Sequence, residues 1–365
     1  MIVLNLRASK RSLQCQLGAA ACLIAALTVT VACKEVPLPS AASTVNPSLS
    51  IAAKASTMAA SPALKSEYAT ANPPYPHINA PRAFVYTREV TAFGPRYMGN
   101  EAHRKLEHYI LDHLKEARLS PDQIEEDDFT ADTVEGKFPV HNIIAKFPGK
   151  KDGIIAILGH YDTNYPLRNI GYVGADDGGS STAILLEYAN YFHDQAARDN
   201  PGPSSKPKLR DGYSVWLVWT DGEEAVRDWS ATDSLYGTRH LAEKWEHDGI
   251  LKKIKAVFVM DMIAAKNVNI LRDDNSTPWL LDLIQTAAAR AGNQSYFNGI
   301  ETPMEDDHLP FVRRGVPSAD VIGMPYGYND VFHHTAQDTM DKLDPKCLAI
   351  VGDTILETVR LLDQK

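Results

Sequence analysis

The stretch IIAILGHYD, residues 154–162, is an apolar run that leads directly into a histidine and an aspartate. Three further apolar runs end in a similar way: VWLVW (215–219) before Asp221-Gly222-Glu223-Glu224, AVFVM (256–260) before Asp261, and ADVI (319–322) before a loop to His333-His334. Short unbroken runs rich in Val and Ile are typical of strands buried on both faces of a parallel sheet. The sequence therefore predicts an α/β fold with a mostly parallel, twisted central sheet flanked by helices on both faces.

The residues that follow these runs are of the types that bind metals. In such sheets the ligand crevice lies beyond the carboxyl ends of the strands, so side chains at several strand ends point into one cleft. Zinc is bound by imidazole nitrogen and carboxylate oxygen. A lone His or Asp at a strand end is usually a cap or a satisfied polar group, but here five occur in the order His, Asp, Glu, Asp, His. The predicted metal-ligating residues are His160, Asp177, Glu224, Asp261 and His334.

Two neighbours of these residues have predicted supporting roles. Asp162 lies two residues after His160, on the same side of an extended segment, where it can accept the second imidazole proton and fix the tautomer. The alternative for Asp162 is a simple loop cap. Glu223 adjoins Glu224 but should point the other way, which leaves it free as a general acid and base.

The first 80 residues differ in composition from the rest of the chain. Residues 1–32 carry Arg7, Lys10 and Arg11 before an uncharged apolar stretch, which predicts a signal peptide. The sequence Thr30-Val31-Ala32-Cys33 is similar to the lipid-attachment box of bacterial lipoproteins, and ordinary signal cleavage nearby is the alternative. Residues 33–80, rich in Ala, Ser and Pro, form a predicted tether, and residues 81–365 a single catalytic domain.

The net charge and the cysteines limit the binding partners that we expect for this protein. The formal net charge is −9, and loss of the three cations of residues 1–32 would make it about −12, which argues against a nucleic-acid partner. We expect an exported monomer, periplasmic or at the cell surface, that contacts the membrane only through a lipid anchor at Cys33. Cys347 falls in the apolar pattern of the last predicted helix, so we interpret it as a small buried hydrophobe.

Several motifs together resemble one enzyme family. GHYDT (159–163), GADDGG (174–179), DGEEA (221–225) and HHT (333–335) are similar to the zinc aminopeptidase superfamily. Two longer stretches, WSATDSLYGTRHLA (229–242) and DDHLPFVRRGVP (306–317), resemble its animal-type glutaminyl cyclase branch. The resemblance covers roughly residues 93–362.

The resemblance implies roles for individual residues. Asp177, rather than Asp176, would bind the catalytic zinc together with Glu224 and His334, with a cis peptide bond between Asp177 and Gly178. Glu223 would be the acid and base, Asp261 and Asp306 a hydrogen-bonded catalytic pair, and Trp229 a wall of the substrate pocket. His333 stands where animal cyclases carry a tryptophan, which makes the predicted substrate-binding wall more polar. Plain core packing is the alternative for Trp229, and a helix cap is the alternative for Asp306.

Three functions remain open at this point. The first is zinc-dependent cyclisation of an N-terminal glutamine to pyroglutamate with release of ammonia, using one zinc ion. The second is an aminopeptidase that uses two zinc ions, with His160 and Asp261 binding the second and Asp177 bridging both. The third is a catalytically inactive binding protein, which the retention of Glu223 and all five ligand positions disfavours. In the first two cases the substrate is a peptide N-terminus.

Overall fold

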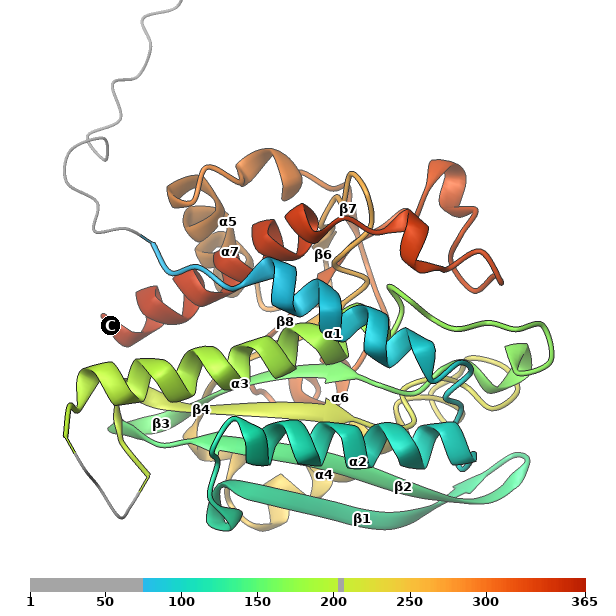
Figure 1. Ribbon diagram of the computed structural model, residues 1–365, viewed down its shortest axis with the longest axis horizontal. Coiled ribbons are helices and arrows are strands. Elements are labelled where there is room, and N and C mark those ends of the chain that lie inside the picture. The colour runs from blue at the N-terminus through green and yellow to red at the C-terminus, as the bar shows by residue number, and fades with distance from the viewer. Residues whose placement is uncertain (1–74, 203–206) are drawn as a thin grey trace, which may run out of the picture. The chain divides into compact units, whose positions relative to one another are not determined.

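The computed structural model of the chain describes residues 75–202 and 207–365 (Figure 1). The predicted signal peptide, Cys33 and the predicted tether up to residue 74 lie outside the described residues. The first described helix begins at Ala80. Among the described helices, none is long and apolar enough to cross a membrane.

The core of the fold is a six-stranded sheet in the order β1-β2-β4-β3-β5-β8. Its strands are β1 (Ile124–Thr133), β2 (Gly136–Phe147), β3 (Gly149–His160), β4 (Arg210–Thr220), β5 (Ile254–Asp261) and β8 (Ser318–Ile322). The four apolar runs form β3, β4, β5 and β8, which are mutually parallel. Strands β1 and β2 are antiparallel, because only two residues, Val134 and Glu135, connect them and so short a turn cannot join parallel strands.

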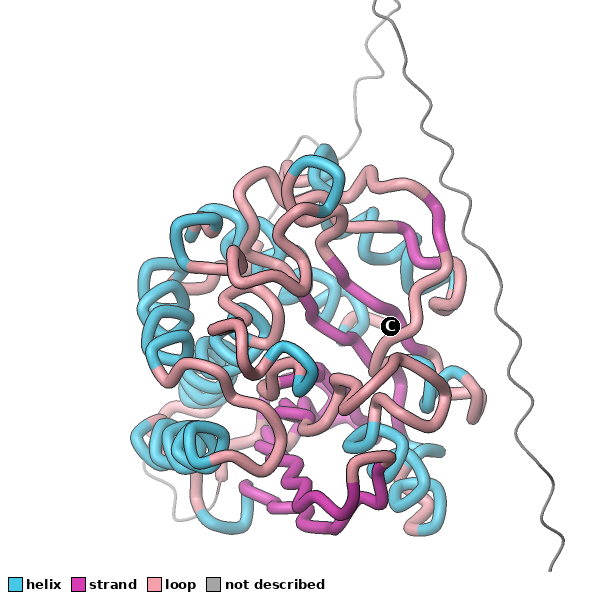
Figure 2. The backbone as a smooth tube through the Cα atoms, turned by 90° about the vertical axis from the view of Figure 1, so that its right-hand side faces the viewer, coloured by secondary structure: helices cyan, strands magenta, loops and turns pink. Residues whose placement is uncertain are grey.

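Both faces of the sheet are covered, as predicted. Along β3, Ile155 and Ile157 belong to one hydrophobic cluster, whereas Ala156 and Leu158 belong to another on the opposite face. The larger cluster includes side chains of α1 (Ala80–Ala92), α2 (Glu101–Glu116), α3 (Gly179–Asp199), α5 (Pro278–Arg290) and α7 (Pro345–Asp363). The other includes side chains of α4 (Tyr236–His247) and α6 (Leu309–Val312). Figure 2 shows the strands lying between these helices. The fold prediction is therefore confirmed.

Polar side chains cap the N-termini of α1, α2 and α7. Asn100 caps α2, since its side-chain oxygen accepts a hydrogen bond from the His103 amide at 2.7 Å. Cys347 is 3% exposed in α7, which confirms its interpretation as a buried hydrophobe. Smaller elements complete the fold: β6 (Arg272–Asp273) and β7 (Glu301–Thr302), and 3₁₀ turns at Pro121–Gln123, Tyr165–Leu167, Leu251–Lys253, Gln294–Tyr296, Tyr328–Asp330 and Met340–Lys342.

Candidate active site

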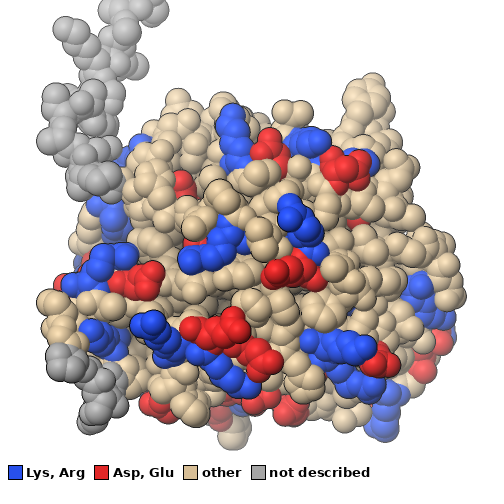
Figure 3. Space-filling view, viewed as in Figure 1, with Lys and Arg blue, Asp and Glu red and all other residues tan. Residues whose placement is uncertain are grey.

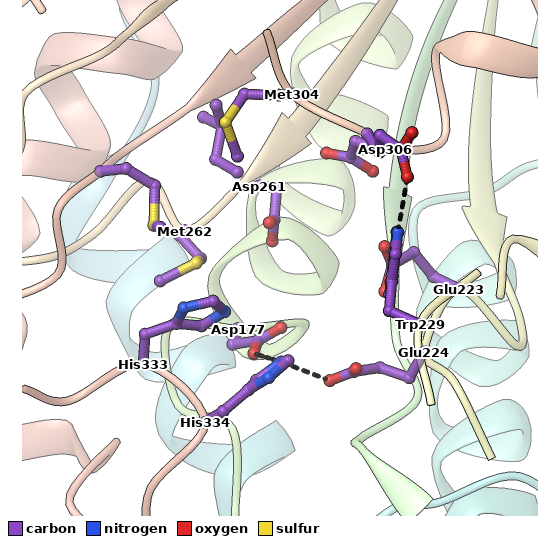
Figure 4. Close-up of a pocket in the computed structure, with 13 residues that line it drawn as sticks. Asp177, Glu223, Glu224, Trp229, Asp261, Met262, Met304, Asp306, His333 and His334 are labelled. Carbon is purple, nitrogen blue, oxygen red and sulfur yellow. Dashed lines mark hydrogen bonds and ion pairs between the residues drawn. The ribbon is translucent and has the colours of Figure 1, made fainter. Parts of the chain in front are cut away.

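The strand ends open into one pocket of about 280 Å³ (Figure 4). His160 ends β3, Asp261 ends β5, and the Glu223-Glu224 pair follows β4. Asp177 comes from the turn before α3, and His334 from the loop after β8. The pocket is lined by Asp177, Glu223, Glu224, Trp229, Asp261, Met262, Met304, Glu305, Asp306, Ile322, Met324, His333 and His334.

The candidate metal ligands lie close together around two imidazoles. The Nε2 atom of His334 is 3.3 Å from Asp177 Oδ2 and 3.3 Å from Glu224 Oε1. The Nε2 atom of His160 is 3.1 Å from Asp177 Oδ1 and 3.3 Å from Asp261 Oδ1. Zinc bonds of about 2.0 Å in a tetrahedron imply ligand atoms roughly 3.3 Å apart. Asp177 thus offers one oxygen to each imidazole, and the spacings suit zinc.

The donor atoms also fit a cation on grounds of charge. Glu224 Oε1 is buried and makes no hydrogen bond, while Oε2 accepts one from Asn164 Nδ2 at 2.6 Å. Burial lowers the pKa of His334, but the facing carboxylates of Glu224 and Asp177 outweigh it and raise that pKa to about 11. Carboxylates that hold a proton on an imidazole this strongly would equally attract a metal ion in its place. The residues present therefore fit zinc.

Backbone geometry orients two of these residues. Gly178 has a left-handed φ of +76°, and a Cβ atom there would lie 2.8 Å from the Asp162 carbonyl oxygen, so only glycine fits this turn. His334 also has a positive φ of 51°, a left-handed conformation that is uncommon for residues other than glycine.

The expected cis bond between Asp177 and Gly178 is not present. Among the described residues the cis peptide bond lies between Met324 and Pro325. The left-handed Gly178 already turns Asp177 toward both imidazoles with a trans bond, without the cost of about 3 kcal/mol of a cis bond to a residue other than proline. Asp176 points away from the pocket and accepts a hydrogen bond from the Ala264 amide at 2.8 Å.

Asp162 contacts His160 less closely than its position in the sequence predicted. The Oδ1 atom is 3.5 Å from His160 Nδ1, which makes no hydrogen bond. The Asp162 carboxylate instead accepts hydrogen bonds from the amides of Glu223 (3.2 Å) and Glu224 (3.3 Å). Asp162 therefore holds the loop that carries both glutamates as well as lying beside His160.

Glu223 lies in the pocket without a protein partner. The residue is 8% exposed, and within the described ranges its carboxyl group makes no hydrogen bond. Burial raises the pKa of Glu223 well above its usual value; His160 opposes this rise, and Glu224 adds to it. A carboxyl group with a raised pKa, free to contact substrate, suits proton transfer near neutral pH.

Asp306 shares the pocket with Glu223 but not in the expected pair. No hydrogen bond joins Asp306 to Asp261 in the described part of the chain; Asp261 instead raises the pKa of Asp306, second to the effect of burial. Asp320, which is buried, lies beside Asp306. Burial raises the pKa of Asp320, and the neighbouring Asp306 carboxylate raises it further. The position of Asp320 inside β8 gave no signal in the sequence, because the strand pattern predicts an apolar residue there. Asp306 does not cap α6, whose N-cap residue is His308.

The predicted substrate-binding residues form part of the pocket wall. Trp229 is 39% exposed, so it is not a core residue, and its Nε1 atom donates to Glu305 Oε2 at 3.2 Å. His333 lies beside His334, with the two ring centroids 4.1 Å apart. The Nδ1 atom of His333 is hydrogen-bonded to Asp330 Oδ2 at 3.0 Å. The wall therefore combines an indole, an imidazole and the methionine side chains of Met262, Met304 and Met324 (Figure 4).

Three supporting residues escaped the sequence analysis. Asn164 holds Glu224, and the Tyr172 hydroxyl donates a short hydrogen bond to Asp177 Oδ2. The Asp338 carboxylate accepts hydrogen bonds from the amides of Asp176 (2.9 Å) and Asp177 (3.2 Å). All three lie within four residues of a recognised motif, which is the one signal that could have indicated them.

Fold and site together define a metal-dependent α/β enzyme of the aminopeptidase type. Residues 142–359 match Peptidase family M28, and the chain belongs to this family. The family is zinc-dependent, in agreement with the imidazole and carboxylate donors of the site.

Within this class the chain is similar to glutaminyl cyclases, as its motifs predicted. It is 48% identical to an Acidobacteriales bacterium glutaminyl cyclase whose crystal structure superimposes with a TM-score of 0.73, over 81% of this chain and 98% of the other. It is 28% identical over 270 residues to the Drosophila melanogaster glutaminyl-peptide cyclotransferase, covering 68% of this chain and 72% of the relative. A Parabacteroides distasonis Zn-dependent exopeptidase, 23% identical with a TM-score of 0.68 over 80% of this chain and all of the other, shares the fold.

Proposed function

We propose that the chain is a glutaminyl-peptide cyclotransferase that converts an N-terminal glutamine into pyroglutamate and releases ammonia. The observation that carries this proposal is the unpartnered Glu223 carboxyl group, which lines a small pocket beside the ligand cluster, together with an exposed Trp229. The similarity to glutaminyl cyclases over nearly the whole length of a solved structure supports the same activity.

Asp177, Glu224 and His334 would hold the zinc ion. When bound, zinc acts as a Lewis acid that polarises the side-chain amide carbonyl of the substrate and stabilises the negative charge that develops on its oxygen. Asn164 and Tyr172 keep the two carboxylates in place through their hydrogen bonds.

Glu223 moves the proton that the reaction requires. The α-amine of the substrate attacks its own side-chain carbonyl carbon, a C–N bond forms, and Glu223 accepts the proton that the amine loses. Glu223 then returns this proton to the departing amide nitrogen, which leaves as ammonia, so no water is consumed. Asp306 lines the same pocket and would steady the leaving nitrogen.

A two-metal aminopeptidase is the second candidate function. It is favoured by one observation, the contact of His160 Nε2 with Asp177 Oδ1 at 3.1 Å and Asp261 Oδ1 at 3.3 Å. These residues could hold a second zinc ion, with Asp177 as the bridge. In that reaction Glu223 would activate water against the first peptide bond.

The two functions predict different products from matched substrates. The purified protein is given one peptide that begins with Gln and, separately, the same peptide beginning with Leu. A cyclase releases ammonia from the first and leaves the second intact, whereas an aminopeptidase releases free leucine. Release of leucine without ammonia would contradict the proposal.

We also propose that the chain is exported and anchored at Cys33, as a monomer that meets the membrane only through that lipid. This proposal is supported by the cationic residues and apolar stretch before Cys33. Replacing Cys33 with Ser should release the protein from the membrane fraction and abolish palmitate incorporation. Unchanged membrane association would contradict it, and sedimentation of the soluble variant checks the monomer.

A further inference from the structure

His333 and His334 place two imidazoles on the same side of the pocket, although they are consecutive residues. Along an extended chain, successive side chains point in opposite directions. Here His334 has a left-handed φ of 51°, and the two ring centroids lie 4.1 Å apart with 40° between the ring planes. Figure 4 shows both rings near Asp177. A second imidazole therefore lies beside the candidate zinc ligand His334.

The His333 ring lies close enough to join the ligand cluster. One ring nitrogen of His333, one ring nitrogen of His334 and a carboxylate oxygen of Asp177 all lie within 4.8 Å of one another. Ligand atoms in a zinc tetrahedron are about 3.3 Å apart, so these distances have to close by at most about 1.5 Å. The His333 side chain is 29% exposed, which leaves room for this movement.

The two ring nitrogens of His333 have different surroundings. The Nδ1 atom is hydrogen-bonded to Asp330 Oδ2 at 3.0 Å, whereas in the described part of the chain the Nε2 atom has no hydrogen-bond partner. Because an ionised carboxylate can only accept, the proton of this hydrogen bond lies on Nδ1 and leaves the lone pair of Nε2 free. Histidines that bind metals almost always donate their other ring N–H to a carboxylate, a carbonyl or water.

Asp330, which orients the His333 ring, is itself fixed by the loop. Its Oδ1 atom accepts a hydrogen bond from the Tyr326 amide at 2.8 Å. Asn329 and Asp330 have left-handed φ values of 54° and 61°, a conformation that Asn and Asp adopt more often than other residues except glycine. This turn brings the Asp330 carboxylate back to the imidazole three residues later. A carboxylate held in this way behind an imidazole is typical of a metal ligand.

We propose that His333 Nε2 is a further ligand of the zinc ion that Asp177, Glu224 and His334 would hold. This inference rests on the proposed function only because that function places zinc at these residues, which the cyclase and the aminopeptidase have in common. By the motif resemblance, animal cyclases carry a tryptophan at this position, and its indole N–H is a donor that cannot bind a metal. The additional ligand is therefore a feature of this chain, and its role is to strengthen zinc binding.

Zinc affinity, measured by competition with a coloured chelator, tests the proposal without an activity assay. His333→Phe keeps a ring beside His334 but has no nitrogen, and Asp330→Asn removes the carboxylate behind the ring. Trp229→Phe changes another aromatic side chain of the pocket wall and is the matched control. We expect Asp330→Asn to weaken zinc binding about 10–100-fold, the usual effect of removing such a partner. His333→Phe should weaken it at least as much, whereas Trp229→Phe should equal wild type.

X-ray absorption at the zinc edge gives a second readout, because imidazole rings bound to zinc produce a recognisable scattering pattern. We expect fewer imidazoles per zinc in His333→Phe than in wild type, and the same number in Trp229→Phe. The comparison holds whether or not His160 binds a second ion, because that imidazole is present in all of these proteins.

The outcomes separate this inference from the proposed function. Equal zinc affinity in His333→Phe and wild type would overturn the inference and leave the proposed function intact. Weaker binding with an unchanged number of imidazoles would also overturn it, since His333 would then act only through the structure of the pocket. If His333→Phe does not fold, unchanged zinc affinity in Asp330→Asn would contradict the inference. Wild-type protein that binds no zinc would contradict the proposed function itself, and this inference with it.

Discussion

Replacing Glu223 with Gln tests the proposed proton transfer most directly. Glutamine has the shape of the glutamate side chain but cannot accept and return a proton. In the described residues the Glu223 carboxyl group makes no hydrogen bond, so the substitution removes no stabilising contact. The free energy of unfolding should therefore not fall, because the burial that raises the pKa of Glu223 disfavours its charged form in the folded protein.

The effect on turnover should be far larger. A positioned general acid and base contributes about 10²–10⁴-fold to rate. Since a tenfold change in rate corresponds to about 1.4 kcal/mol, the activation free energy should rise by about 3–5 kcal/mol. The assay measures ammonia release from a peptide with N-terminal Gln, together with zinc content and thermal unfolding of the same preparation.

Glu224→Gln is the matched control, because it makes the same chemical change one residue further along, at a residue that we propose holds the metal. We expect Glu223→Gln to keep its zinc and its melting temperature while kcat falls, and Glu224→Gln to lose zinc. The reasoning is refuted if Glu223→Gln retains more than about a tenth of wild-type kcat, since general acid–base catalysis requires a larger loss. Loss of zinc in step with activity would also refute it.

Three further predictions concern metal, substrate and pH. Removal of zinc with a chelator should abolish ammonia release, and added zinc should restore it. Chelation should also lower the free energy of unfolding by about 3–4 kcal/mol, relative to protein with zinc at 100–1000 times its dissociation constant. Activity assays and calorimetry measure the two effects. Trp229→Ala should lower kcat/KM about 10–100-fold, because apolar contact with the substrate is lost. The melting temperature should not change, since the Trp229 side chain is 39% exposed. An unaltered kcat/KM would argue against a place for Trp229 in the wall of the substrate pocket. Burial raises the pKa of Asp233, but hydrogen bonds from the amides of Asp228, Val226 and Arg227 and from the Tyr236 hydroxyl outweigh it and hold that pKa below 3.8. Asp233→Asn should therefore destabilise the fold by about 1–3 kcal/mol above pH 4, and the difference should fade as pH drops through the lowered pKa; a difference that does not depend on pH would contradict this origin.

Local sequence reasoning located much of the candidate site. His160, Glu224 and Asp261 follow runs whose apolar character requires burial on both faces, so the edge of the sheet at which they emerge follows from the strand pattern. The motif resemblance added the assignment of Asp177 over Asp176, and in the structure Asp177 is the residue that faces both imidazoles. The pairing of His103 with Asp221 was not indicated, because His103 and Glu107 look like an ordinary pair on an amphipathic helix.

By itself, the sequence determined the class of fold, the positions of the four parallel strands along the chain, and the family, because apolar periodicity and motif identity are local properties of the chain. The tertiary structure alone decided which side chains meet across elements. In the folded protein the Asp162 carboxylate accepts hydrogen bonds from the amides of Glu223 and Glu224. Asp306 lies beside Asp320, and His103 contacts Asp221. The physical reason is that residue spacing fixes the face on which a side chain lies, whereas its partner depends on how helices and strands pack against one another.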